Sequence, residues 1–449
     1  MGGSRELHGY RGFAHGGGGA RSGGRPRGHR SALSARRVGR VSRTARIELP
    51  DALRAWVERE TGSTVVASAS HHAGASRSAW NLEVEAAGAV RRLFLLKDKR
   101  DGGGSIRDAA VLRALAETGI PVPEVVAADK KQAVVVLSRL PGRSDFPAAD
   151  EPQELRERTA AHLMALTAKL HALDPRRLRI AHLALPETPE DCARRTLTEV
   201  RGALRALGEA ADPFFQFALN WLEANAPNSV EHYSLVHSDM GPGNFLFEEG
   251  RVTGIIDWEV AHFGDPMEDL AAIAVRDMAT PVGSLAKRFD EYAACSGNAV
   301  DLPRVHYYRA LVLVRNSLMI GLGIAQPSKQ MDIDEMTMYQ TLLVRAAALV
   351  LCDNLGIERP DQPPPVGDPT DAERVDVSAL LGRPMSSLPD GASIDAALRD
   401  AVAGDPTAGA ERGADLARFF ALRLHRVAQS HKALLGVLFE RLPQLLVPR

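Results

Sequence analysis

Three oxygen-bearing side chains lie close together in the sequence, on short connections between apolar stretches. Asp239 and Asn244 follow the apolar run 233–236, and a second apolar strand is expected at 245–247. After a charged turn at 248–251, a third strand ends in Asp257. Strand-loop-strand connections this short can bring the three side chains to one place. One carboxylate then accepts the proton of an attacking hydroxyl, while the amide and the second carboxylate hold magnesium against phosphates. This is the set that phosphoryl transfer from ATP requires.

The spacing of these residues matches known signatures. Segment 237–244, HSDMGPGN, has the pattern of the protein-kinase catalytic loop, with Ser where that loop has Arg. Segment 256–259, IDWE, matches the metal-binding Asp motif, with Trp-Glu where kinases have Phe-Gly. Together with 264–270, GDPMEDL, these stretches resemble the aminoglycoside phosphotransferase and choline-kinase-like family of small-molecule kinases. No Walker A sequence occurs, which excludes a P-loop enzyme at the level of motifs.

The resemblance covers about residues 50–355. It implies an α+β, protein-kinase-like two-lobed fold, with a small, mostly antiparallel β N-lobe and a larger helical C-lobe. It also implies an ATP-dependent phosphotransferase that moves the γ-phosphate to a hydroxyl of a small molecule, with ATP and Mg2+ as cofactors. Asp239 would act as the catalytic base, His237 would support the catalytic loop through hydrogen bonds, and Asn244 and Asp257 would coordinate magnesium.

The nucleotide side of the site is expected in the first part of this region. The connection 72–78 lies between expected strands at 64–68 and 81–86. In this family the corresponding turn covers the ATP phosphates. Gly74 and Ser76 are small enough there for backbone N–H groups and a hydroxyl to approach oxygen atoms closely.

A cation and an acid are expected beside this turn. Lys97 ends the expected strand 90–97 and resembles the strand lysine that pairs with the nucleotide phosphates; Lys99 is a neighbouring alternative. The family has a Glu on the next helix to hold this lysine, and the matching residue on the expected helix 105–118 is Asp108. Because Asp is one methylene shorter, the ion pair is expected to be longer, water-bridged or absent.

The boundary between the lobes is expected near Gly142. Expected strands at 125–128 and 133–137 lead into Ser138 and Leu140. This stretch resembles the hinge of the family, where backbone N–H and C=O groups bond the edge of adenine.

Helical periodicity dominates after the hinge. His171 is expected to be a hydrogen-bonded core residue, and Asp265 and Asp269 are expected to brace the catalytic loop and cap the next helix. Arg309, Arg315 and Asn316 are expected on a solvated face, with the lining of a pocket as the alternative. The expected helices are 152–174, 194–207, 213–226, 269–275, 284–295, 303–324 and 334–355.

Composition shifts divide the chain into five segments. An apolar stripe repeats at helical spacing in 414–442, and such a helix is expected to dock on the kinase lobe or on another chain, so self-association is one expectation. The segments are a disordered Gly/Arg-rich tail (1–46), the N-lobe (47–142), the C-lobe (143–358), a Pro-rich linker (359–369) and a helical C-terminal module without an assigned role (370–449).

Overall composition favours a cytoplasmic protein without nucleic-acid or membrane partners. Residues 1–46 carry a balance of +10, so the formal net charge of −1 leaves a mildly acidic body with no nucleic-acid surface. The three cysteines form no C-x-x-C pair, which argues against a disulfide framework or a zinc site. No uninterrupted apolar run approaches the length of a membrane span, and 36–37 is not followed by the apolar region of an export signal.

Two alternatives stay open. The first is a hydroxyacyl-CoA kinase, because similar kinase domains occur alongside acyl-CoA dehydrogenases and phosphorylate hydroxyacyl-CoA. The second is a nucleotide-binding pseudokinase that serves as an interaction module. A polycationic aminoglycoside needs clustered carboxylates, whereas CoA needs Arg or Lys for its phosphates. The sequence after Asp257 offers both signs of charge and does not decide between these acceptors.

Overall fold

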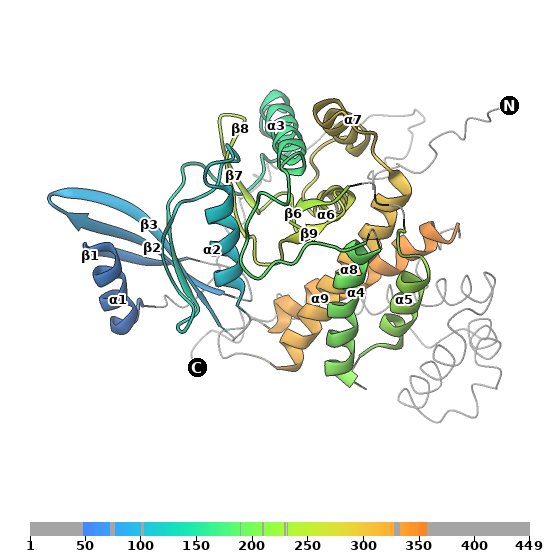
Figure 1. Cartoon of the computed structure of the whole chain (residues 1–449), viewed down its shortest axis with the longest axis horizontal. Coiled ribbons are helices and arrows are strands. Elements are labelled where there is room, and N and C mark those ends of the chain that lie inside the picture. Colours follow the sequence, from blue (N-terminus) through green and yellow to red (C-terminus); the bar gives the residue numbers. More distant parts are fainter. Residues whose placement is uncertain are drawn as a thin grey trace, which may run out of the picture. The chain divides into compact units, whose positions relative to one another are not determined.

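The computed structural model shows a protein-kinase-like α+β fold with a β-rich N-lobe and a helical C-lobe (Figure 1). The tail 1–46, Gly74, Ser76, the linker 359–369 and the module 370–449 lie outside the described residues. The residues that the structure describes are 48–71, 77–99, 103–188, 190–208, 211–228, 230, 232–326 and 333–356.

The N-lobe is built on a five-stranded antiparallel sheet with the order β1-β2-β3-β5-β4. The register between the second and third strands places Arg77 opposite Asp98 and Ser78 opposite Lys97. Directly opposite residues share a face of the sheet. The strands are β1 (Thr64–His71), β2 (Arg77–Ala86), β3 (Ala89–Asp98), β4 (Val125–Asp129) and β5 (Val134–Ser138).

A helix covers each face of this sheet. Leu93 and Leu95 of β3 pack in one buried cluster with α1 (Asp51–Thr61), whereas Leu96 packs in a second cluster with α2 (Gly104–Leu115). Successive side chains of a strand point to opposite faces, which explains the alternation. The second cluster continues into the C-lobe core, and Figure 1 shows α2 between the sheet and the C-lobe. A residue of β3 therefore points toward the C-lobe only if it shares a face with Leu96.

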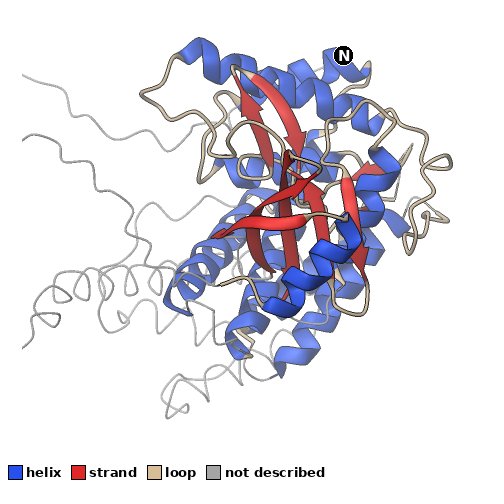
Figure 2. Ribbon diagram, turned by 90° about the vertical axis from the view of Figure 1, so that its left-hand side faces the viewer, coloured by secondary structure: helices blue, strands red, loops and turns tan. Residues whose placement is uncertain are grey.

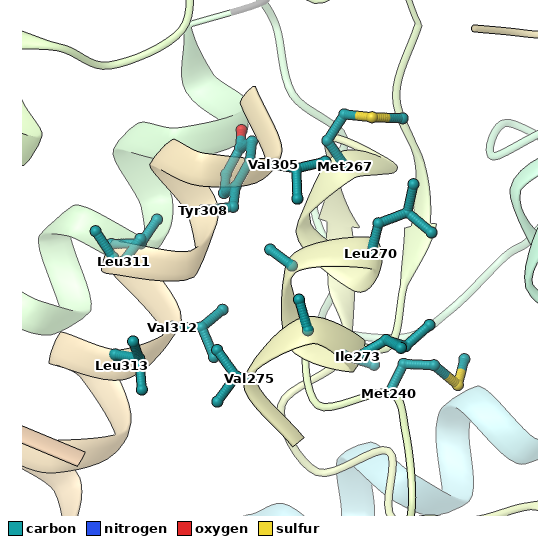
Figure 3. Close-up of a cluster of buried hydrophobic side chains, with 14 of the residues drawn as sticks. Met240, Met267, Leu270, Ile273, Val275, Val305, Tyr308, Leu311, Val312 and Leu313 are labelled. Carbon is teal, nitrogen blue, oxygen red and sulfur yellow. The ribbon is translucent and has the colours of Figure 1, made fainter. Parts of the chain in front are cut away.

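The C-lobe is assembled around the long helix α8, whose residues pack against α6 and α9. Figure 3 shows Leu270, Ile273 and Val275 of α6 beside Val305 and Val312 of α8. In the view of Figure 2, helices lie around the strands of the protein, and the helices of the C-lobe make up most of them. They are α3 (Gln153–His171), α4 (Asp191–Leu207), α5 (Pro213–Ala224), α6 (Met267–Asp277), α7 (Leu285–Ser296), α8 (Leu302–Ala325) and α9 (Ile333–Asn354).

Helix α8 is long and apolar enough, by length and composition, to cross a membrane. However, 61% of its most apolar window is buried inside the protein, and its Arg315 forms a buried ion pair with Glu268. Burial of this extent is expected of the central core helix of a helical lobe.

Two small antiparallel sheets carry the loops that were expected to hold the chemistry. Strand β6 (Ser234–Val236) pairs with β9 (His262–Gly264), and β7 (Phe245–Glu248) pairs with β8 (Arg251–Ile255). Loop 237–244 joins β6 to β7. Because the β7–β8 hairpin is antiparallel, the residue before β7 lies beside the residues after β8.

Candidate active site

Helix α6 holds the start of the catalytic loop in an uncommon backbone conformation. Ser238 has a φ of 65°, in the left-handed region that non-glycine residues seldom adopt. The buried carboxylate of Asp269 accepts hydrogen bonds from the backbone N of His237 (3.0 Å) and Ser238 (2.6 Å), and from Nε2 of His171 (3.0 Å). Burial opposes ionisation of Asp269, but these hydrogen bonds and nearby histidines outweigh it and lower its pKa. The expected bracing role of Asp269 and the core role of His171 are confirmed.

His237 is fixed by contacts on both ring nitrogens. Nε2 donates to the carbonyl oxygen of Ile256 (2.9 Å), and Nδ1 accepts from the backbone N of Asp239 (3.3 Å). The ring also lies against Trp258, with 4.6 Å between the centroids. This arrangement leaves neither nitrogen free for a substrate proton, so His237 supports the loop.

Asp239 faces the site with an arginine on its carboxylate. The side chain is 27% exposed, and Arg276 at the end of α6 donates through Nε to Oδ1 (3.0 Å) and through Nη2 to Oδ2. Burial opposes ionisation of Asp239, but the charge and hydrogen bonds of Arg276 outweigh it and lower its pKa. Gly241 permits this contact, because a Cβ there would lie 2.9 Å from Arg276 Cδ.

Asn244 joins the two acidic residues. Its Nδ2 donates to the backbone oxygen and to Oδ2 of Asp239, both at 2.8 Å, and its backbone oxygen accepts from the N of Ile256 (3.0 Å). The second bond places Asp257, which has a φ of 71°, at the same end of the β7–β8 hairpin. The structure therefore brings Asp239, Asn244 and Asp257 to one place between the lobes.

The donors in this group fit a magnesium ion shared with phosphates. Among the described residues, no three His, Cys, Asp or Glu side chains are grouped so as to hold a metal alone. Asn244 uses its Nδ2 on Asp239, so the amide oxygen is the atom left for a cation, and the Asp257 side chain is 34% exposed. Magnesium commonly takes one or two protein ligands and completes its shell with water and phosphate oxygens.

Asp108 does not pair with Lys97, so of the three outcomes expected for this pair the structure has the last, an absent ion pair. Lys97 lies on the same face of β3 as Leu95 and opposite Val134, in the face that α1 covers. Its Nζ donates to the carbonyl oxygen of Gln132 (3.0 Å), in the turn between β4 and β5. Strand alternation is the physical reason, because Asp108 lies on α2 behind the other face.

Arg77, which the sequence reasoning missed, is the partner of Asp108. Its Nη1 bonds Oδ2 of Asp108 (2.9 Å), its Nη2 bonds Oδ1 of Asp257, and its Nε lies 3.4 Å from Oε2 of Glu259. Oδ1 of Asp108 also accepts from the backbone N of Trp258 (3.1 Å). Burial opposes the charge of Arg77, but the three carboxylates outweigh it and raise its pKa. The only sequence signal for this role was a cation at the start of β2.

The expected hinge crosses between the lobes against the β7–β8 hairpin. Ser138 has its backbone N bonded to the oxygen of Glu124 (2.8 Å) and its Oγ bonded to the N of Glu124 (2.8 Å). The Ser138 N–H is thus committed within the sheet, and the adenine contact through it is not available. Leu140 lies over Gly254, where a Cβ would come within 2.1 Å of Leu140 Cδ1. An adenine contact through the Leu140 backbone stays a prediction.

A buried ion cluster supports the catalytic loop from behind. Arg315 of α8 was expected on a solvated face, but it is 5% exposed and donates through Nη2 to the oxygen of Ser238 (2.8 Å). Its Nη1 lies 3.4 Å from Oε1 of Glu268, whose Oε2 is 3.2 Å from Nε2 of His262. Burial opposes ionisation of Glu268, but His262 and Arg315 outweigh it and lower its pKa. No sequence spacing pointed to this contact, since 77 residues separate Arg315 from Ser238.

Comparisons with known proteins agree with this geometry. The model of the phosphotransferase enzyme family matches residues 70–308. Acyl-CoA dehydrogenase family member 11 of Gallus gallus is 27% identical over 231 residues, which are 46% of this chain and 29% of that protein. Viomycin phosphotransferase of Streptomyces vinaceus is 34% identical over 182 residues, which are 37% of this chain and 60% of that protein. This chain thus spans less than a third of the first relative.

A solved structure supports the fold. A Ralstonia eutropha protein described as an aminoglycoside phosphotransferase is 17% identical, with a TM-score of 0.50, and the match covers 65% of this chain and 95% of that chain. The family match includes the catalytic loop and the metal-binding motif and extends over more than half of the sequence. This protein therefore belongs to the phosphotransferase enzyme family.

Proposed function

We propose that this protein transfers the γ-phosphate of ATP to a hydroxyl group of a small molecule. The observation that carries the proposal is the convergence of Asp239, Asn244 and Asp257 at one end of the β7–β8 hairpin. Phosphoryl transfer depends mainly on positioning and on charge stabilisation, and these three side chains supply a base and two oxygen ligands.

Each residue has a separate task in this mechanism. Asp239 is held ionised by Arg276, so it accepts a hydrogen bond from the acceptor hydroxyl. Asp239 takes the hydroxyl proton as the acceptor oxygen bonds to the γ-phosphorus, while the bond from that phosphorus to the β–γ bridging oxygen breaks and ADP leaves. Asn244 orients Asp239 through Nδ2 and, with Asp257, holds magnesium. When bound, magnesium neutralises charge on the phosphate oxygens. His237 and Asp269 keep the loop in the conformation that aims Asp239.

The first candidate acceptor is an aminoglycoside-like or viomycin-like antibiotic. Its support is the family and the similarity to viomycin phosphotransferase. The second candidate is a hydroxyacyl-CoA. Its support is the similarity to the relatives named acyl-CoA dehydrogenase family member 11.

Calorimetry followed by a substrate panel tests the proposed function. Mg-ATP should bind the full chain, and ATP consumption should rise with one class among aminoglycosides, viomycin, amino alcohols, sugars and hydroxyacyl-CoAs. Asp239→Asn should abolish transfer while nucleotide affinity stays close to that of the wild type, because the base acts on the acceptor. Absence of Mg-ATP binding to the wild type would refute the kinase function and favour the interaction-module alternative.

A further inference from the structure

Lys97 was predicted to bind the nucleotide phosphates, but its side chain lies on the face of the sheet that points away from the C-lobe. Lys97 lies on the face covered by α1 and donates to Gln132. Arg77 of β2 lies one register position away, at the same end of the β2–β3 pair, and it points to the other face. It lies opposite Asp98 and shares a face with Ala79, which packs in the cluster that contains α2. Arg77 therefore stands on the side where Lys97 was expected.

Arg77 has one carboxylate partner that is buried and two that are partly exposed to solvent. The Arg77 and Asp108 side chains are 5% and 2% exposed, so their ion pair is fully enclosed. Asp257 and Glu259 are 34% and 27% exposed, so the other edge of the guanidinium meets acids that solvent reaches. The guanidinium is anchored at one nitrogen and directed by another toward the carboxylate that we assign to magnesium.

We propose that Arg77 supplies, from β2, the cation that binds the phosphates of the nucleotide, in the place predicted for Lys97. The proposal rests on the proposed function. Nη1 stays on Asp108, which fixes the guanidinium against α2. Use of the Asp257 oxygen by a cation frees Nη2 for a phosphate oxygen. A guanidinium offers several donors in a rigid plane, which suits one carboxylate and one phosphate at the same time.

A purely structural role makes a different prediction. Arg77 would then only tie α2 to the segment after β8, and its loss would lower stability without regard to the number of phosphates on the ligand. A phosphate-binding role predicts a loss of affinity for ADP and ATP, while adenosine binds as before. This difference separates the two roles by binding alone.

Calorimetry with the full chain in Mg2+ makes the comparison. Arg77→Met should weaken ADP and ATP binding by about tenfold or more, the scale of one charge-assisted contact, and leave adenosine unaffected. Lys97→Met, the matched control on the neighbouring strand, should bind ATP within about twofold of the wild type. Weak ATP binding by Lys97→Met together with wild-type binding by Arg77→Met would overturn the proposal.

A double variant controls for the buried acid. Arg77→Met alone leaves the Asp108 carboxylate enclosed without its cation, which is destabilising. Arg77→Met/Asp108→Asn removes both charges, so its melting temperature should recover toward that of the wild type while ATP affinity stays weak. Recovery of ATP affinity in the double variant would show that Arg77 is only a tie. A wild type that binds neither ADP nor ATP would refute this proposal together with the proposed function, whereas wild-type binding with unaffected variants refutes the proposal alone.

Discussion

Two arginines, each on a different carboxylate, define the site at the level of single residues. Arg276 holds Asp239, the proposed base, and Arg77 holds Asp257, the proposed magnesium ligand. Both acids are partly exposed, so a ligand can compete with the arginine for each of them. The pKa of Asp239, the proposed base, is therefore set by Arg276, which is not one of the three residues that the sequence motif marks.

Removal of Arg276 should shift the pH profile of the reaction. Arg276 lowers the pKa of Asp239, so Arg276→Ala should raise that pKa and move the acidic limb of kcat/KM to higher pH. Arg276→Lys keeps the charge and should retain most of the wild-type profile. The measurement is kcat/KM for the acceptor from about pH 5 to 9. An unchanged acidic limb in Arg276→Ala would mean that Asp239 is not the group that titrates.

At the level of single residues, the sequence predicted which side chains come together in the site better than it predicted the contacts of the cations around them. The spacing of Asp239, Asn244 and Asp257 was enough to place them together, because short strand-loop-strand connections allow few alternatives. The face on which Lys97 lies depends on strand register, and the position of Arg77 depends on it as well. Register is set by packing on both faces of the sheet, which a local pattern does not contain.

Helix α6 organises the site at the level of elements. Asp269 in its first turn fixes the catalytic loop, Glu268 holds Ser238 and Arg315, and Arg276 in its last turn reaches Asp239. One helix thus sets both the backbone of the loop and the charge of the base.

Replacement of Asp269 should damage stability and activity together. Asp269→Asn removes a buried charge that accepts from two backbone N–H groups and His171. The free energy of unfolding should fall by about 2–4 kcal/mol, and transfer should fall because Ser238 is no longer held at positive φ. Urea unfolding and steady-state kinetics measure the two effects. Wild-type kinetics in a destabilised Asp269→Asn would show that the loop keeps its conformation without this acid.

Asp265, just before α6, should make stability depend on pH. Burial is the main cause that raises its pKa to about 6, against the opposing charge of Arg304. An acid whose folded pKa is raised favours the folded state when protonated. The unfolding free energy of the wild type relative to Asp265→Asn should therefore rise by about 1–3 kcal/mol as pH falls from about 7 to 4. A difference that is constant across this range would place the pKa of Asp265 near its ordinary value.

Helices were easier to predict from the sequence than the small sheets. The expected helix 303–324 is observed as Leu302–Ala325, because caps and apolar periodicity mark both ends of a long element. Strand β9 was missed, since three residues, His262–Gly264, are too few for a periodic signal.

At the level of the whole described molecule, the main feature is the contact by which the hinge between the lobes is attached to the C-lobe. Beyond the hinge the chain forms an isolated antiparallel bridge, Arg143 with Phe247, and Thr253 Oγ1 donates to the oxygen of Pro141 (2.6 Å). The hinge is therefore fastened to the same β7–β8 hairpin that ends in Asn244 and Asp257. The groups that we propose to bind the nucleotide and the metal therefore share one support.

At Gly142 the hinge passes so close to the β7–β8 hairpin that a side chain has no room. Its φ is 100°, and a Cβ would lie 2.5 Å from the backbone oxygen of Phe247 and 2.8 Å from its carbonyl carbon. Gly142→Ala should therefore move the hinge away from the hairpin, lower the free energy of unfolding by about 2 kcal/mol or more, and weaken ATP binding. Urea unfolding and calorimetry with Mg-ATP measure the two effects.

Gly88, in the turn between β2 and β3, is the matched control for this substitution. It also has a positive φ, 79°, but a Cβ there would meet nothing within 4 Å. Gly88→Ala carries the conformational strain without the collision, so it should cost only about 1 kcal/mol and leave ATP binding unchanged. The difference between the two variants isolates the collision with Phe247. Equal losses in both would show that the hinge can shift without cost, and that the β7–β8 hairpin does not position the nucleotide.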